Sequence, residues 1–235
     1  MNEEIIQNIW MFVRGDLDAK SFEAWVYQFN ELESILSEEF YLEIISTDYK
    51  SASKIYELRQ KLEEWLRKSN DLACQCVSLA NIDITHMGSE REDEVFKTLQ
   101  EIKAHGEPLW WLALHRCSVC MQNWLTAQET RQNDVHCFKR LTNNESDKIT
   151  KENSWPEYFR TYEELLKLGK ENGCSVHFID PLNSSPVYTA IDLAKERPGI
   201  SVSEIASLLD VSHELAIEIC KKAIFEEQVD ICIAE

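Results

Sequence analysis

The sequence predicts a mainly helical α+β protein. We expect a helical N-terminal domain, residues 1–70, and a larger C-terminal domain, residues 71–235, with a small antiparallel sheet of two or three strands packed by helices. The chain contains only 6 glycines and 5 prolines among 235 residues, which favours long helices over tight hairpins. Apolar residues recur at helical spacing through most of it, and one strand–turn–strand pattern near the middle predicts the sheet.

The N-terminal domain is predicted from two amphipathic helices. In the first, Asp18 is placed to cap the helix, and apolar residues on one stripe predict a buried face with acidic residues opposite. The second helix, 53–68, repeats the pattern. The two stripes are Phe22, Trp25, Val26, Phe29 and Leu32, and Ile55, Leu58, Leu62, Trp65 and Leu66.

The C-terminal domain is predicted to begin with a helix over 89–106. Ser89 and Glu92 have the spacing of a capping box, and Gly106 marks the end. From residue 109 the segments LWWLALHRC and QNWLTAQ flank a Cys-x-x-Cys pair like the strands of a hairpin, anchored by Trp110, Trp111 and Trp124. Residues 175–180, SVHFID, are the candidate third strand.

Further helices are predicted toward the C-terminus. Residues 154–173 form the first, with Ser154 as the cap, Pro156 in the first turn and Glu157 completing a capping box. The tail, 187–234, is predicted to form three short helices, with a capping box at Ser201 and Glu204. This order of helices resembles a helix–turn–helix, but the last helix is acidic. We therefore expect the three helices to pack within the fold and not to bind DNA.

The charge points to a basic partner. The chain has a net charge of −18, and residues 1–48 carry eleven acidic and two basic residues, a net −9. Such a charge disfavours nucleic acid and anionic membranes as direct ligands, and no apolar run reaches the roughly 20 residues that span a bilayer. A basic protein fits the charge best; the alternative is that the acids only keep the protein soluble.

Eight cysteines raise the question of metal or redox chemistry. Cys117 and Cys120 have the spacing of a zinc knuckle, but zinc needs two further ligands. Met121 stands where a knuckle favours glycine, and no thioredoxin-like pattern supports a redox dithiol. The sequence therefore favours a structural hairpin with no metal and no cofactor. If zinc binds, the remaining candidates are Cys137, Cys74 with Cys76, and His115 or His136.

No catalytic motif is present in the sequence. It lacks a phosphate-binding glycine loop, a dinucleotide fingerprint, a zinc-protease His-Glu-x-x-His and a nucleophile elbow. We therefore expect that the protein is not an enzyme.

Longer motifs carry a resemblance to a known class of protein. The segments CSVCMQNWLTAQETRQNDVHCFKRL, WPEYFRTYEELLKLG and FIDPLNSSPVYTAIDLAKERPGISVSEIASLLDVS resemble a group of small bacterial cytoplasmic proteins. Residues 12–49 resemble the helical module of bacterial immunity proteins. Together, over roughly residues 10–70 and 107–215, the chain resembles an immunity protein of a contact-dependent growth inhibition system.

The resemblance implies an inhibitor that binds the nuclease domain of a toxin in the cytoplasm. Such a toxin binds RNA or DNA in a basic cleft, and carboxylates of the inhibitor would block this cleft. We expect the toxin to be a ribonuclease. The alternative is a regulatory protein with a zinc ribbon and a helix–turn–helix. For the inhibitor, the predicted partner-binding residues are the acids of 16–48: Asp16, Asp18, Glu31, Glu33, Glu38, Glu39, Glu43 and Asp48.

Overall fold

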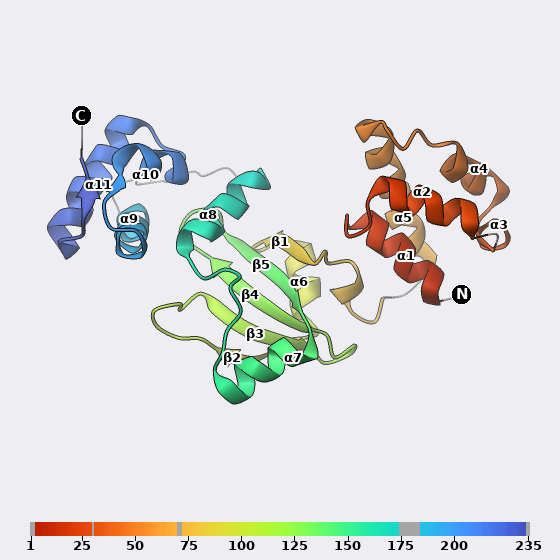
Figure 1. Cartoon of the computed structure of the whole chain (residues 1–235), viewed down its shortest axis with the longest axis horizontal. Coiled ribbons are helices and arrows are strands. Elements are labelled where there is room, and N and C mark those ends of the chain that lie inside the picture. The colour runs from red at the N-terminus through yellow and green to blue at the C-terminus, as the bar shows by residue number, and fades with distance from the viewer. Residues whose placement is uncertain (1–2, 30, 70–71, 174–183, 234–235) are drawn as a thin grey trace. The chain divides into compact units, whose positions relative to one another are not determined.

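A computed structural model describes residues 3–29, 31–69, 72–173 and 184–233 (Figure 1). The contacts divide the chain into two units, residues 1–81 and 82–235, and each is described by itself. The boundary predicted from the sequence lies at 70/71. Within the described residues, no helix has the length and apolar character needed to cross a membrane.

The N-terminal unit is helical. Asp18 caps α2 as predicted, since its carboxylate accepts a hydrogen bond from the backbone N–H of Ser21 at 3.0 Å, and the second predicted helix is confirmed as α5. The core contains the stacked rings of Phe12 and Phe22, whose centroids are 3.8 Å apart. The helices are α1 (Glu3–Val13), α2 (Ala19–Gln28), α3 (Leu32–Ile35), α4 (Glu38–Ser46) and α5 (Ala52–Ser69), followed by the 3₁₀ turn η1 (Gln75–Val77).

The C-terminal unit is built on a five-stranded antiparallel sheet, so the prediction of two or three strands was wrong. The predicted hairpin is confirmed as β3 and β4, while the candidate strand at 175–180 lies outside the described residues. The strand order is β1-β5-β4-β3-β2, and the strands are β1 (Ile82–His86), β2 (Leu99–Ala104), β3 (Leu112–Cys117), β4 (Asn123–Glu129) and β5 (Val135–Leu141).

The extra strands come from segments whose local pattern is ambiguous. The predicted helix over 89–106 is wrong beyond its first turns, because α6 covers only Glu90–Phe96 and β2 follows. Leu99 and Ile102 fit the helical spacing, but β2 hydrogen bonds with β3, and a β-bulge between Glu101 and Lys103 interrupts its alternation. Long-range pairing thus overrides the local periodicity.

The two faces of the sheet differ in chemistry. Residues paired across antiparallel strands share a face, so Leu114 and Leu125 lie on one face with Ala127 and Cys137, within the apolar core of this unit. The opposite face carries polar side chains, including His136, and α6 contributes Phe96 to it, 4.8 Å from the His136 ring. This second face also holds the buried rings of Trp124 and Phe138, and it is called the polar face below because of its histidine, threonine and carboxylate groups.

The remaining helices complete the unit. The helix predicted over 154–173 with Ser154 as its cap was placed too early: α8 begins at Tyr162, capped by Thr161, and Phe159 has a left-handed φ of 60°. The three tail helices and the capping box of Ser201 and Glu204 are confirmed. These elements are α7 (Asn143–Asp147), the π-helical turn η2 (Lys148–Glu152), α8 (Tyr162–Glu171), α9 (Ser184–Glu196), β6 (Ile200–Ser201), α10 (Val202–Leu209), α11 (His213–Glu227) and β7 (Ile231–Cys232).

Candidate functional site

The turn between β3 and β4 presents two cysteines. Cys117 ends β3 and is buried, and Cys120 is exposed in the turn. The turn is closed by two backbone hydrogen bonds, from the Cys117 N–H to the Gln122 carbonyl (2.9 Å) and from the Met121 N–H to the Cys117 carbonyl (3.1 Å). Met121, at the position where a knuckle favours glycine, takes a left-handed conformation with φ 61°. The knuckle-type turn therefore forms despite the methionine.

The Cys117 sulfur has two hydrogen-bond partners beside it. The Val119 N–H donates to Sγ at 3.4 Å, and the Thr98 hydroxyl lies 3.5 Å away. Burial raises the pKa of the Cys117 thiol, but hydrogen bonds with the Thr98 side chain, with the N–H groups of Cys120 and Val119, and with the Cys120 side chain outweigh it and lower the pKa to about 6. The thiolate, the form that ligates metals, is thus favoured near neutral pH.

A second pair of cysteines lies in the segment after α5. Cys74 is half-buried and extended, and Cys76 is buried within η1. Hydrogen bonds to the end of α1 hold this segment, because Arg14 Nη1 donates to the Val77 carbonyl at 2.7 Å and the Asn81 N–H donates to Asp16 at 3.0 Å. Both cysteines are therefore in an ordered segment and not in a free linker.

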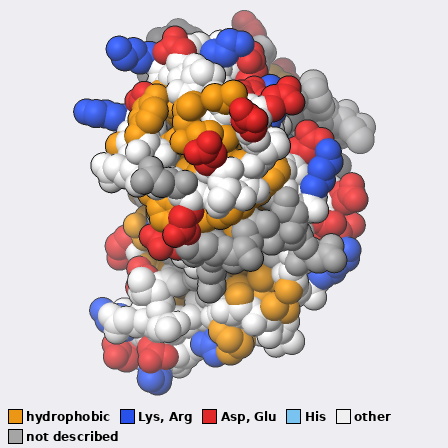
Figure 2. Space-filling model, turned by 90° about the vertical axis from the view of Figure 1, so that its right-hand side faces the viewer, with side chains coloured by type: hydrophobic (Ala, Val, Ile, Leu, Met, Phe, Trp, Pro, Cys, Tyr) orange, Lys and Arg blue, Asp and Glu red, His pale blue; other side chains and the backbone are white. Residues whose placement is uncertain are grey.

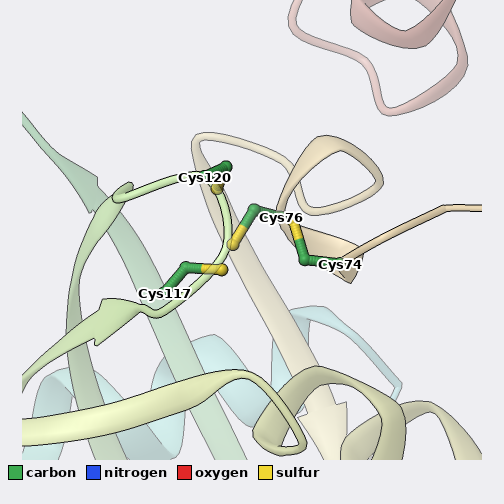
Figure 3. A group of neighbouring side chains, drawn as sticks. All are labelled: Cys74, Cys76, Cys117 and Cys120. Atoms are coloured by element: carbon green, nitrogen blue, oxygen red, sulfur yellow. The ribbon is translucent and has the colours of Figure 1, made fainter.

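The structure brings the two pairs together. The sulfur atoms of Cys74, Cys76, Cys117 and Cys120 all lie within 4.8 Å of one another, and Figure 3 shows the four side chains pointing toward a common centre. Cys74 with Cys76 was one of the ligand pairs that the sequence left open. Four thiols in one cluster form a donor set suited to a soft, tetrahedral metal ion.

The other ligand candidates lie elsewhere. Cys137 is in the apolar core of the C-terminal unit. His115 and His136 are on the polar face of the sheet, where His115 Nδ1 lies 2.9 Å from the Thr126 hydroxyl and His136 Nδ1 lies 2.7 Å from Glu92. None of these three belongs to the sulfur cluster. The Cys-x-Cys at 74–76 was the available sequence signal, but its one-residue spacing matches no knuckle, and only the fold places it beside the hairpin.

The polar face of the sheet holds a cavity of about 410 Å³. Its lining includes His115, His136, Thr126 and Glu92. Burial, with a further contribution from His136, lowers the pKa of His115 to about 4, and burial lowers the pKa of His136 against the opposing effect of Glu92. His115 is therefore neutral at pH 7, and the cavity combines this neutral imidazole with carboxylates such as that of Glu92.

The motifs behind the resemblance meet inside the C-terminal unit. Glu129, the last residue of WLTAQE, is fully buried and accepts hydrogen bonds from the N–H groups of Arg131 (2.9 Å) and Gln132 (3.0 Å), from the Asn133 N–H, and from the hydroxyl of Tyr162. Tyr162 belongs to the motif WPEYFRTYEELL. Glu129 and Tyr162 therefore have a structural role, and only the fold brings their two segments together, since nothing local in the sequence links them.

The eight predicted partner-binding acids fall into two groups in the N-terminal unit. Glu31, Glu33, Glu38 and Glu39 are exposed along α3 and the start of α4. Among the described residues, the carboxylates of the first three form no hydrogen bond or ion pair, and Glu39 acts on Lys61 only at longer range. The other four have local partners: Asp16 with Arg14, Asp18 with Ser21, Glu43 with Lys61, and Asp48 with the N–H of Lys50.

Large hydrophobic side chains are also exposed on the N-terminal unit. Tyr27, Leu42 and Tyr56 are 59%, 51% and 65% exposed. Figure 2 shows hydrophobic side chains in the upper part of the view, with Asp and Glu side chains on and around them, and a second hydrophobic group in the lower part. Apolar area bordered by charge is typical of a protein-binding surface.

No protein family model, no curated protein and no solved structure matches the chain.

Proposed function

We propose that the protein is an inhibitor of a basic protein partner, and specifically an immunity protein that neutralises a nuclease toxin in the cytoplasm. The observation that carries the proposal is the exposed acidic stretch of α3 and α4, where Glu31, Glu33 and Glu38 form no ion pair among the described residues. A net charge of −18 and the resemblance noted above add support.

The mechanism follows from charge and bulk. Carboxylates of the inhibitor take the positions that substrate phosphates occupy in a basic nuclease cleft, and the protein excludes RNA or DNA from it. Opposite charges also accelerate association, which matters because a toxin must be bound before it acts. Exposed apolar side chains such as Leu42 add contact area that charge steering alone does not provide.

The test is binding to a panel of purified, catalytically inactivated bacterial nuclease toxin domains. We expect tight binding to a cognate ribonuclease toxin. In the variant with Glu31, Glu33, Glu38 and Glu39 changed to Lys, the association rate constant at 0.15 M salt falls about ten-fold or more. A matched variant of equal charge change uses exposed acids of the C-terminal unit: Glu152, Glu157, Glu171 and Glu218.

Two results would contradict this proposal. One is a panel without a binding partner. The other is an α3–α4 variant that binds as fast as the matched control while circular dichroism shows both to be folded, since the interface would then lie on another surface.

A zinc-containing, DNA-binding regulator is the second candidate function. The sulfur cluster favours its metal-binding half. The last tail helix, α11, is less favourable for DNA, because Glu214 and Glu218 are exposed on it beside Lys221 and Lys222. Binding to duplex DNA that weakens steeply with salt would support the regulator over the inhibitor.

A further inference from the structure

We propose that Cys74, Cys76, Cys117 and Cys120 bind one structural zinc ion as four thiolates. The proposal is independent of the inhibitor function, because it concerns a metal site and not the acidic surface. It rests on the placement of the four side chains (Figure 3).

The distances suit a tetrahedral ion. Zinc–sulfur bonds of about 2.3 Å place the four sulfurs of a tetrahedron about 3.8 Å apart. The four sulfurs here are within 4.8 Å of one another, so side-chain rotations that move each sulfur by a fraction of an ångström complete the tetrahedron.

The donor set selects the metal and its role. Four sulfur ligands without a carboxylate exclude calcium and magnesium, which prefer oxygen, and favour zinc. Four protein ligands also leave no open position for water or substrate. The ion is therefore structural, and the proposal adds no catalytic activity to the protein.

The surroundings of the cluster support a metal ligand at Cys117. The Val119 N–H points at its sulfur, as outer-shell donors do around metal-bound thiolates. The turn is also fixed to the residue before β2, because the Ser118 N–H and hydroxyl both donate to the Thr98 carbonyl, at 2.8 and 3.1 Å. Cys117 and Cys76 are almost completely buried, at 0% and 4% exposed, whereas Cys74 is half-buried and Cys120 is exposed, so the site is shielded from water on one side only.

The remaining described cysteines do not belong to the sulfur cluster. Cys137 and Cys220 lie in the apolar core of the C-terminal unit, where they pack as small hydrophobic residues. Cys232 is exposed in the two-residue strand β7. Cys137 and Cys220 serve as internal references in the experiment, and Cys232 as the matched control.

The first experiment uses the whole unmodified chain. Protein purified in the presence of zinc and a thiol reductant is analysed for metal, and its cysteines are alkylated before and after chelation, with mass spectrometry identifying the modified positions. We expect one zinc per chain, with Cys74, Cys76, Cys117 and Cys120 protected until the chelator is added. Absence of metal, a bound iron ion or iron–sulfur cluster, or alkylation of these four in the zinc-loaded chain would overturn the proposal.

The second experiment uses paired variants. Cys74→Ser/Cys76→Ser and Cys117→Ser/Cys120→Ser should each lower the zinc content at least about ten-fold, because two ligands cannot hold the ion tightly. Cys232→Ser should keep one zinc per chain. Cobalt(II) added to the metal-free wild-type chain should give the thiolate charge-transfer band and tetrahedral d–d bands, a readout that does not depend on the variants folding. Full zinc retention by either double variant, or an octahedral cobalt spectrum, would overturn the four-thiolate site.

Discussion

Individual acidic side chains in the two units of the molecule have opposite roles. In the N-terminal unit, Glu33 and Glu38 are exposed on helices, while the core of the unit consists of aliphatic and aromatic side chains. In the C-terminal unit, Glu129 is fully buried and surrounded by hydrogen-bond donors. The same residue type is therefore available to a partner in one unit and is part of the fold in the other.

Net charge alone therefore does not identify a binding surface. A buried carboxylate with several donors is structural, because removing its partners leaves a charge without water. An exposed carboxylate contributes little to stability and remains free to meet a basic partner. Mutations of single acids should separate the two roles.

The largest expected effect is at Glu129. Glu129→Gln replaces one acceptor oxygen by an amide that faces N–H donors, so we expect the free energy of unfolding to fall by about 3 to 5 kcal/mol, measured by chemical denaturation. Tyr162→Phe removes only the hydroxyl and should cost about 1 to 2 kcal/mol. Equal stability of Glu129→Gln and wild type would contradict the structural role of this carboxylate.

A pH effect is expected next, from the polar sheet face. The pKa of His115 in the folded protein, about 4, is below its ordinary value of 6.5, so the unfolded chain binds more protons between these values. Stability from this group is complete above pH 6.5 and is lost as the pH falls toward 4, by at most about 3 kcal/mol.

The measurement is denaturation at pH 7 and pH 4.5. His115→Gln should show a smaller loss of stability over this range than wild type, with His136 and the carboxylates still contributing in both proteins. An identical pH dependence in the two proteins would show that His115 does not titrate differently on folding.

A smaller gain is expected in the cysteine turn. Met121 has a left-handed φ of 61°, so Met121→Gly relieves strain of about 1 to 2 kcal/mol, offset in part by the greater flexibility of glycine in the unfolded chain. We expect a net stabilisation of about 0.5 to 1 kcal/mol by thermal or chemical denaturation. Val119→Gly is the control, since it adds flexibility without a left-handed residue to relieve, and should destabilise the protein.

The smallest effect is expected at the exposed acids of α3 and α4. Glu33→Gln and Glu38→Gln should each change the free energy of unfolding by less than about 0.5 kcal/mol, because neither carboxylate has a partner among the described residues. The comparison with Glu129→Gln uses the same chemical change in both units. A loss at Glu33 as large as that at Glu129 would remove the distinction between the two kinds of acid.

Helices with strong local signals could be predicted from the sequence. The Asp18 cap, the apolar stripe of α5 and the capping box of Ser201 and Glu204 are all confirmed, because a cap and an amphipathic stripe depend on residues a few positions apart. The hairpin of β3 and β4 was predicted for the same reason, since its strands are joined by one short turn.

Tertiary structure decided what depends on distant residues. Strand β2 continues a helical apolar pattern and forms a strand only because β3 pairs with it. Helix α8 begins at Tyr162 with Thr161 as its cap, although Ser154 has the local form of a cap. Cys74 and Cys76 show the same limit, because forty residues separate them from the Cys117 turn and no spacing rule links them. The sequence by itself thus determined the local elements and the charge, whereas the sheet, the buried Glu129 and the sulfur cluster arise only when long-range contacts bring separate segments together.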